Sequence, residues 1–213
     1  MATDHSPTPP TPPRPAAAAA PLVFHFDFIS PYGYFASRQI EAIAARHGRA
    51  VDWRPMLLGV SVMKVMGLKP LLDTPLKGDY VERDVRRHQR ALGLPMARQP
   101  RDPMMNPLPA ARAAAWVRAH RPAALAGVVH AIYGAVWGAG QDLSTPASLA
   151  PVVGADIADA AGGDEAAALL RALVDEGLRA GVFGSPTVVV DGEPFWGVDR
   201  LPDVDRWLAT GGW

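Results

Sequence analysis

One stretch constrains the fold of this chain more than any other: residues 22–36, which read LVFHFDFISPYGYFA. Its first half alternates aromatic and polar residues, which is typical of a buried strand. Its second half follows Ser30-Pro31, and proline is favoured at the first helical position after a serine N-cap. The sequence therefore predicts a strand that ends where a helix begins, with Ser30 at the junction.

Ser30 has two interpretations that the stretch alone leaves open. A serine before a proline at such a junction often does nothing more than cap the helix. The same hydroxyl also lies beside the free backbone N–H groups of a helix start, where a thiolate or a carboxylate is stabilised. The rest of the chain has to decide between a cap and an anion site.

Composition limits the chemistry that this chain can perform. Its 213 residues include no cysteine, so any thiol chemistry must use a thiol borrowed from a ligand. The 21 basic and 21 acidic residues balance, which gives no general attraction to nucleic acid or to an anionic membrane. No apolar run approaches the ~20 residues that span a bilayer. We expect a cytoplasmic protein without nucleic-acid or membrane partners.

The order of the predicted elements indicates the fold class. A second strand is expected over residues 51–55, and about a hundred mostly helical residues follow it. A β-branched strand over 187–190 then leads through Asp191-Gly192, a strong hairpin turn, into a returning strand over 193–196. A strand, a helix and a strand at the start favour a parallel βαβ unit.

This order predicts an α/β protein with a thioredoxin-like core and an all-helical domain inserted after the second strand. The core is expected to comprise residues 22–58 and 181–213, with a helix over 164–180 packed on it. Residues 59–163 are expected to form the helical insertion. Residues 1–21 are rich in proline and alanine and are predicted to be a disordered tail.

Five motifs in this order carry a resemblance to a known family: residues 26–32 (FDFISPY), 53–59 (WRPMLLG), 75–80 (PLKGDY), 184–187 (GSPT) and 195–201 (FWGVDRL). The chain resembles the 2-hydroxychromene-2-carboxylate isomerases, a glutathione-dependent branch shared with kappa-class glutathione transferases and DsbA-like proteins. DsbA-like proteins carry Cys-x-x-Cys at the start of the first helix, where this chain reads Ser-Pro-Tyr-Gly. The redox dithiol is therefore absent.

The resemblance implies a glutathione site. Ser30 would hold the thiol of bound glutathione as the catalytic residue. Ser185 and Pro186 match a cis-proline loop, whose main chain faces the helix start and pairs with glutathione in the manner of a strand. Asp199 and Arg200 match the position that meets the γ-glutamyl end, although they also fit an exposed pair at a helix start.

Two further cofactor-binding candidates rest on weaker matches. Lys77 matches a family lysine near the glycine end of glutathione or the substrate carboxylate. Asn106 begins a predicted helix, so it is either a glutathione contact or only a cap. The chain departs from the family at Leu68, where many relatives have asparagine, and at Gly33, where serine or another small polar residue is common. These departures concern the substrate more than the fold.

The function implied by the resemblance is interconversion of 2-hydroxychromene-2-carboxylate and trans-o-hydroxybenzylidenepyruvate, in aromatic hydrocarbon degradation, with glutathione as cofactor and no metal. The partner is then a small aromatic carboxylate, and a homodimer is a further expectation. Trp53, Met56, Met63 and Met66 are candidates for an apolar wall against the aromatic ring. Two alternatives stay open: a kappa-like glutathione transferase that consumes glutathione, and a non-catalytic thioredoxin-like protein that binds a partner at the same cleft.

Overall fold

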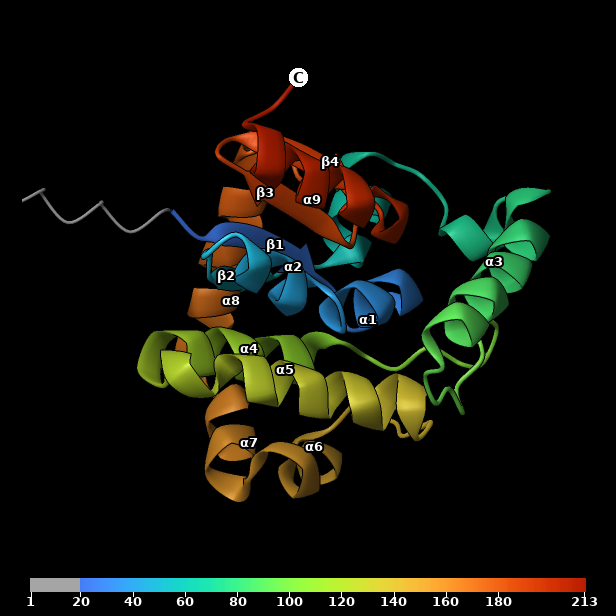
Figure 1. Ribbon diagram of the computed structural model, residues 1–213. Coiled ribbons are helices and arrows are strands. Elements are labelled where there is room, and N and C mark those ends of the chain that lie inside the picture. The colour runs from blue at the N-terminus through green and yellow to red at the C-terminus, as the bar shows by residue number, and fades with distance from the viewer. Residues whose placement is uncertain (1–19) are drawn as a thin grey trace, which may run out of the picture.

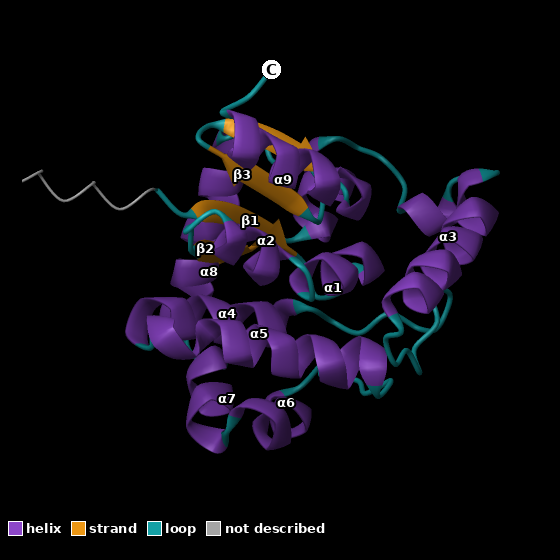
Figure 2. Ribbon diagram, viewed as in Figure 1, coloured by secondary structure: helices purple, strands orange, loops and turns teal. Residues whose placement is uncertain are grey.

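The computed structural model describes residues 20–213. Figure 2 shows one small sheet surrounded by helices. The predicted tail, residues 1–21, lies outside the described residues except for its last two. Within residues 20–213, no helix combines the length and apolar composition needed to cross a membrane.

The sheet has four strands in the order β2-β1-β3-β4. They are β1 (Leu22–Phe26), β2 (Val51–Pro55), β3 (Thr187–Val190) and β4 (Glu193–Trp196). β1 pairs with β2 in parallel, and β3 is antiparallel to both β1 and β4. Because β3 runs against β1, the loop that enters β3 lies at the end of the sheet where β1 finishes.

The helices around the sheet come from both the N-terminal and the C-terminal parts of the chain. The N-terminal part supplies α1 (Pro31–Ser37) and α2 (Ile40–Arg46), and the C-terminal part supplies the short turn η5 (Val198–Arg200) and α9 (Leu201–Thr210). The aromatic and apolar residues after Ser30 predict one helix as far as His47-Gly48, and the structure divides it into α1 and α2. Side chains take over its hydrogen bonds at the break, since Gln39 Nε2 donates to the Phe35 carbonyl and Ser37 Oγ to the Tyr34 carbonyl.

The segment between β2 and β3 is helical, as predicted. Its elements are η1 (Gly59–Val65), η2 (Leu71–Asp73), α3 (Lys77–Leu92), α4 (Leu108–His120), η3 (Pro122–Ala124), α5 (Leu125–Tyr133), η4 (Gly134–Gly138), α6 (Pro146–Val153), α7 (Ala155–Ala161) and α8 (Asp164–Arg179). In Figure 1, α4 and α5 lie side by side below the sheet, α6 and α7 lie beyond them, and α3 stands to one side of α1.

Aromatic side chains join the helical segment to the sheet. The ring of Tyr133 lies 5.0 Å from that of Phe28 and 6.1 Å from that of Phe26. The Trp137 indole N–H donates to the Phe28 carbonyl at 2.8 Å. The predicted fold class, a thioredoxin-like core with a helical insertion after the second strand, is confirmed. The exact division at residues 58, 163 and 181 stays a prediction.

Candidate active site around Ser30 and the Ser185-Pro186 loop

Ser30 caps α1 and also reaches across to a distant loop. Its Oγ accepts a hydrogen bond from the Gly33 N–H at 3.0 Å, which is the predicted N-cap contact. The same hydroxyl donates to the Ser185 carbonyl oxygen at 2.9 Å. Ser30 is only 3% exposed, so both bonds lie in a buried setting. The cap and the candidate site are therefore served by one hydroxyl group.

The loop that holds Ser185 is fixed at several points. The Ser185–Pro186 bond is cis, as the resemblance implied. The Ser185 Oγ accepts from the Asp27 N–H at 2.9 Å, and the Pro186 carbonyl accepts from the Gly197 N–H at 3.0 Å. The predicted approach of the Ser185 main chain to Ser30 is confirmed by the 2.9 Å hydrogen bond between them.

Asp27 is a buried carboxyl group at this junction that the sequence interpretation did not select. Its side chain is 1% exposed and accepts from the N–H groups of Leu58, at 2.7 Å, and Ile29, at 3.2 Å. Burial raises the pKa of Asp27 to about 6, although these two hydrogen bonds act in the opposite direction. An acidic residue inside a buried apolar run was the available signal, because such groups are seldom buried without partners.

Tyr133 completes the junction from the helical segment. Its hydroxyl donates to the Asp27 carbonyl at 3.0 Å, and that carbonyl also accepts from the Ser30 N–H. Burial raises the pKa of Tyr133 well above its usual value. A Cβ atom at Gly33 would collide with this hydroxyl and lie 3.1 Å from the Ser185 Oγ. The tyrosine hydroxyl thus occupies the space of the small polar side chain expected at Gly33.

Asp199 and Arg200 lie near the loop but are paired with each other. They belong to η5, which packs against α1 and begins directly after Gly197, the residue that holds the Pro186 carbonyl. The two side chains form an ion pair at 3.0 Å, and Arg200 also pairs with Asp203 at 3.1 Å. Their proposed contact with the γ-glutamyl end of glutathione stays a prediction.

Lys77 and Asn106 are not connected to the junction. Lys77 is the exposed first residue of α3. Asn106 is exposed, and its side-chain oxygen accepts at 3.1 Å from the N–H of Leu108, the first residue of α4. Across residues 20–213, no hydrogen bond or ion pair joins either side chain to Ser30 or Ser185. Their contacts with glutathione stay predictions.

The start of α3 borders a surface hollow of about 410 Å³ that is separate from the Ser30 junction. Arg101 supplies the cation there, and its guanidinium is bonded to Asp79 at 2.7 Å and also to Glu82. An anion entering this hollow would meet a charge that two carboxylates already satisfy. The hollow therefore fits the carboxylate of a substrate poorly.

The expected apolar wall is only partly available. Trp53 and Met56 are each 4% exposed and belong to the interior, where Trp53 packs edge-on against Phe24 at 5.0 Å. The interpretation of these two as a wall was wrong, because burial in the core leaves no face for a ligand. Met63 and Met66, in contrast, are 53% and 38% exposed.

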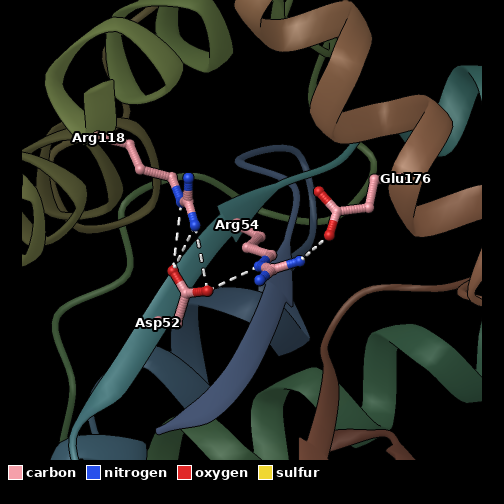
Figure 3. A network of polar contacts seen from close by, with 4 residues as sticks. All are labelled: Asp52, Arg54, Arg118 and Glu176. Atoms are coloured by element: carbon pink, nitrogen blue, oxygen red, sulfur yellow. Dashed lines mark hydrogen bonds and ion pairs between the residues drawn. The ribbon is translucent and has the colours of Figure 1, made fainter.

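A second polar cluster lies on the face of the sheet that α8 covers. Figure 3 shows Asp52 and Arg54 of β2 linked to Arg118 of α4 and Glu176 of α8. Asp52 bonds Arg54 at 2.8 Å and Arg118 at 2.9 Å, and Arg54 bonds Glu176 at 2.5 Å. We refer to Asp52, Arg54, Arg118 and Glu176 as the charged network.

His25 lies beside the charged network and is 3% exposed. Burial, together with the charge of Arg54, lowers the pKa of His25 to about 4.

Comparisons with known proteins agree with this architecture. A family model described as a DSBA-like thioredoxin domain matches residues 21–209. A 2-hydroxychromene-2-carboxylate isomerase from Pseudomonas putida is 26% identical over 187 residues, which cover 84% of this chain and 89% of that protein. The protein of the same name from Sphingobium xenophagum is 28% identical over 204 residues, covering 87% and 96%.

Solved structures show the same fold at lower identity. A 2-hydroxychromene-2-carboxylate isomerase superposes with a TM-score of 0.75 at 23% identity, covering 88% of this chain and 94% of that one. The cytosolic disulfide reductase DsbM from Pseudomonas aeruginosa, solved with GSH, gives 0.58 at 19% identity, covering 88% and 95%. The resemblance in the sequence is confirmed, and the chain belongs to the DsbA-like thioredoxin family.

Proposed function

We propose that this protein is a glutathione-dependent isomerase that interconverts 2-hydroxychromene-2-carboxylate and trans-o-hydroxybenzylidenepyruvate. The observation that carries the proposal is the Ser30 hydroxyl, held 2.9 Å from the Ser185 carbonyl beside a cis-proline loop. The names of the related isomerases support the reaction, and the DsbM structure with GSH supports the cofactor within the fold. The aromatic carboxylate substrate is part of the same proposal.

The absence of cysteine separates this chain from the redox members of its fold. Disulfide exchange requires a thiolate, and none of the 213 residues can supply one. A free thiol has a pKa of ~8.5, so only a few per cent is ionised at neutral pH. A hydroxyl donor favours the anion through a charge-assisted hydrogen bond. Ser30 is suited to this task at the position where redox relatives carry cysteine.

The residues at the junction fit a cysteinyl peptide such as glutathione. The Ser185 main chain offers groups for strand-like pairing, and the carboxylate of Asp199 lies in the adjoining turn, where it suits an ammonium group. Bound glutathione supplies a nucleophilic thiolate that adds reversibly to a conjugated double bond and so permits rotation about it. The helix α1 has only seven residues, so its dipole is short and the Ser30 hydroxyl is the main donor.

The chain's own residues then have distinct tasks. Ser30 donates to the sulfur and stabilises its charge, while Asp27 and Tyr133 fix the backbone on which Ser30 sits. The substrate carboxylate needs a cation, for which Lys77 or an arginine of residues 83–90 is the candidate. These residues belong to α3, the helix that packs against α1, and Lys77 forms no ion pair among residues 20–213.

A glutathione balance during turnover tests the proposal. The protein is incubated with glutathione and a panel of chromene carboxylates, and both substrate conversion and total free glutathione are measured. We expect conversion with no net loss of glutathione. Loss of one glutathione per product would favour the kappa-like transferase, and saturable glutathione binding without conversion of any compound would favour the binding protein. Homodimer formation stays a prediction, which sedimentation would test.

A further inference from the structure

The single proton of the Ser30 hydroxyl is already committed in this structure. A carbonyl oxygen can only accept, so the 2.9 Å contact with Ser185 O uses the Ser30 proton. A backbone N–H can only donate, so the 3.0 Å contact with Gly33 uses a lone pair of the same oxygen. Without a ligand, Ser30 therefore has no proton left to offer to a sulfur atom.

In the main chain of Ser185, the carbonyl group has a hydrogen-bond partner and the N–H group has none among residues 20–213. Its carbonyl receives the Ser30 proton, and its side-chain oxygen accepts from the Asp27 N–H at 2.9 Å. Its own N–H donates to no group among residues 20–213. Ser185 thus presents a free donor next to an acceptor that is occupied by a neutral hydroxyl, and an extended peptide needs both groups in order to pair.

We propose that Ser30 is a switched donor, which turns to the thiolate only after an amide N–H of the ligand has replaced it on the Ser185 carbonyl. This inference rests on the proposed function and specifies the class of thiol that the site activates. The thiol must belong to a cysteinyl residue whose own amide N–H reaches Ser185. A simple thiol without that N–H leaves the Ser30 proton where it is.

The exchange is balanced in hydrogen bonds and protons. The bond between Ser30 and Ser185 O is lost, and a ligand N–H bond to the same carbonyl replaces it. The Ser30 hydroxyl keeps its bond from Gly33 and gains a charge-assisted bond to sulfur, which is about twice as strong as a neutral one. The thiol proton goes to solvent, so binding of the correct ligand near neutral pH releases a proton.

The test compares glutathione with its depsipeptide analogue, in which an ester oxygen replaces the cysteinyl N–H. The ultraviolet absorbance of the thiolate is followed against pH for each compound at saturation. We expect the bound glutathione thiol to have a pKa at least about one unit below ~8.5, and the bound analogue to stay near ~8.5. An equal lowering for both compounds would overturn the switch and leave the proposed function intact.

Two controls keep the outcomes distinct. In Ser30→Ala both thiols should titrate near ~8.5, whereas Ser37→Ala, which removes another buried hydroxyl of α1, should behave as wild type. If glutathione fails to bind, the proposed function itself fails. If the analogue binds too weakly to be titrated, a structure of the glutathione complex tests the switch instead. We expect Ser30 Oγ to lie beyond hydrogen-bond reach of Ser185 O, and persistence of that bond would contradict the switch.

Discussion

Two polar clusters fasten the sheet to its helices, and they do so by different means. At the junction after β1, neutral hydroxyls and main-chain groups bond to one another, and Asp27 is the one carboxyl group among them. In the charged network between β2, α4 and α8, two carboxylates and two guanidinium groups pair directly. Both clusters connect segments that are far apart in the sequence.

The difference indicates which cluster can bind a ligand. In the charged network each ion already has a partner, so an incoming ion must compete with a charge held at contact distance. At the junction, a ligand only has to exchange one neutral hydrogen bond for another, which changes the free energy little. A buried group of neutral hydrogen bonds, in which no ion pair has to be broken first, is suited to a thiolate.

Removal of the Ser30 hydroxyl should have the largest effect. We expect Ser30→Ala to lower isomerase turnover by ~10²–10³-fold, because it removes a preorganised donor to an anion. The matched control is Ser37→Ala, since Ser37 is equally buried in α1 but donates to the Tyr34 carbonyl at 2.7 Å. The control should lose some stability and keep its turnover. Full activity in Ser30→Ala would reduce Ser30 to a cap.

The dependence of stability on acid should distinguish the two regions through two buried titratable groups, Asp27 at the junction and His25 beside the charged network. Because the pKa of His25 is lowered to about 4, the folded state binds fewer protons than the unfolded state between about pH 4 and the ordinary value of 6.5. His25 therefore destabilises the fold by on the order of 3 kcal/mol as the pH falls through that range. We expect His25→Leu to remove this loss in urea unfolding at several pH values.

Asp27 should act with the opposite sign. Its pKa is raised from 3.8 to about 6, so its contribution to stability is present below about pH 4 and is lost as the pH rises to about 6. Asp27→Asn should therefore make the stability rise more steeply with pH across that window than it does in wild type. Parallel pH profiles for His25→Leu and Asp27→Asn would contradict this assignment.

A glycine and a tyrosine at the junction should be energetically coupled. A Cβ atom at Gly33 would collide with the Tyr133 hydroxyl, so Gly33→Ala should cost about 1–3 kcal/mol of stability. Tyr133→Phe should relieve part of that cost in the double variant, with a coupling energy of about 1 kcal/mol. Gly127→Ala is the control, since nothing lies within 4 Å of a Cβ there. Additive effects would show that the two residues do not compete for space.

Disruption of the charged network should lower the stability of the fold and leave isomerase turnover unchanged. Asp52→Asn weakens the contacts with Arg54 and Arg118, and we expect a loss of about 1–2 kcal/mol because the cluster is only partly buried. Glu165→Gln, which breaks the exposed pair with His120, should cost about 0.5 kcal/mol or less. Turnover per folded molecule should equal wild type in both variants. A specific loss of turnover in Asp52→Asn would extend the active site to this face.

The sequence predicted those parts of the site that depend on local signals. The serine and proline after an aromatic strand located the N-cap, and the Asp-Gly turn located the hairpin that carries the Ser185 loop. Tyr133 could not be found in this way, because it lies 106 residues from the Asp27 carbonyl that it bonds. The sequence also did not predict the break between α1 and α2, where the Ser37 and Gln39 side chains bond carbonyl groups of α1.

The pKa of the glutathione thiol bound to wild type and to Ser30→Ala tests the central claim most directly. Thiolate absorbance is titrated against pH at saturating protein, with binding verified separately by calorimetry. The account predicts a pKa at least about one unit below ~8.5 in wild type and a value near ~8.5 in Ser30→Ala. The same pKa in both proteins would contradict the assignment of Ser30 as the group that stabilises the thiolate.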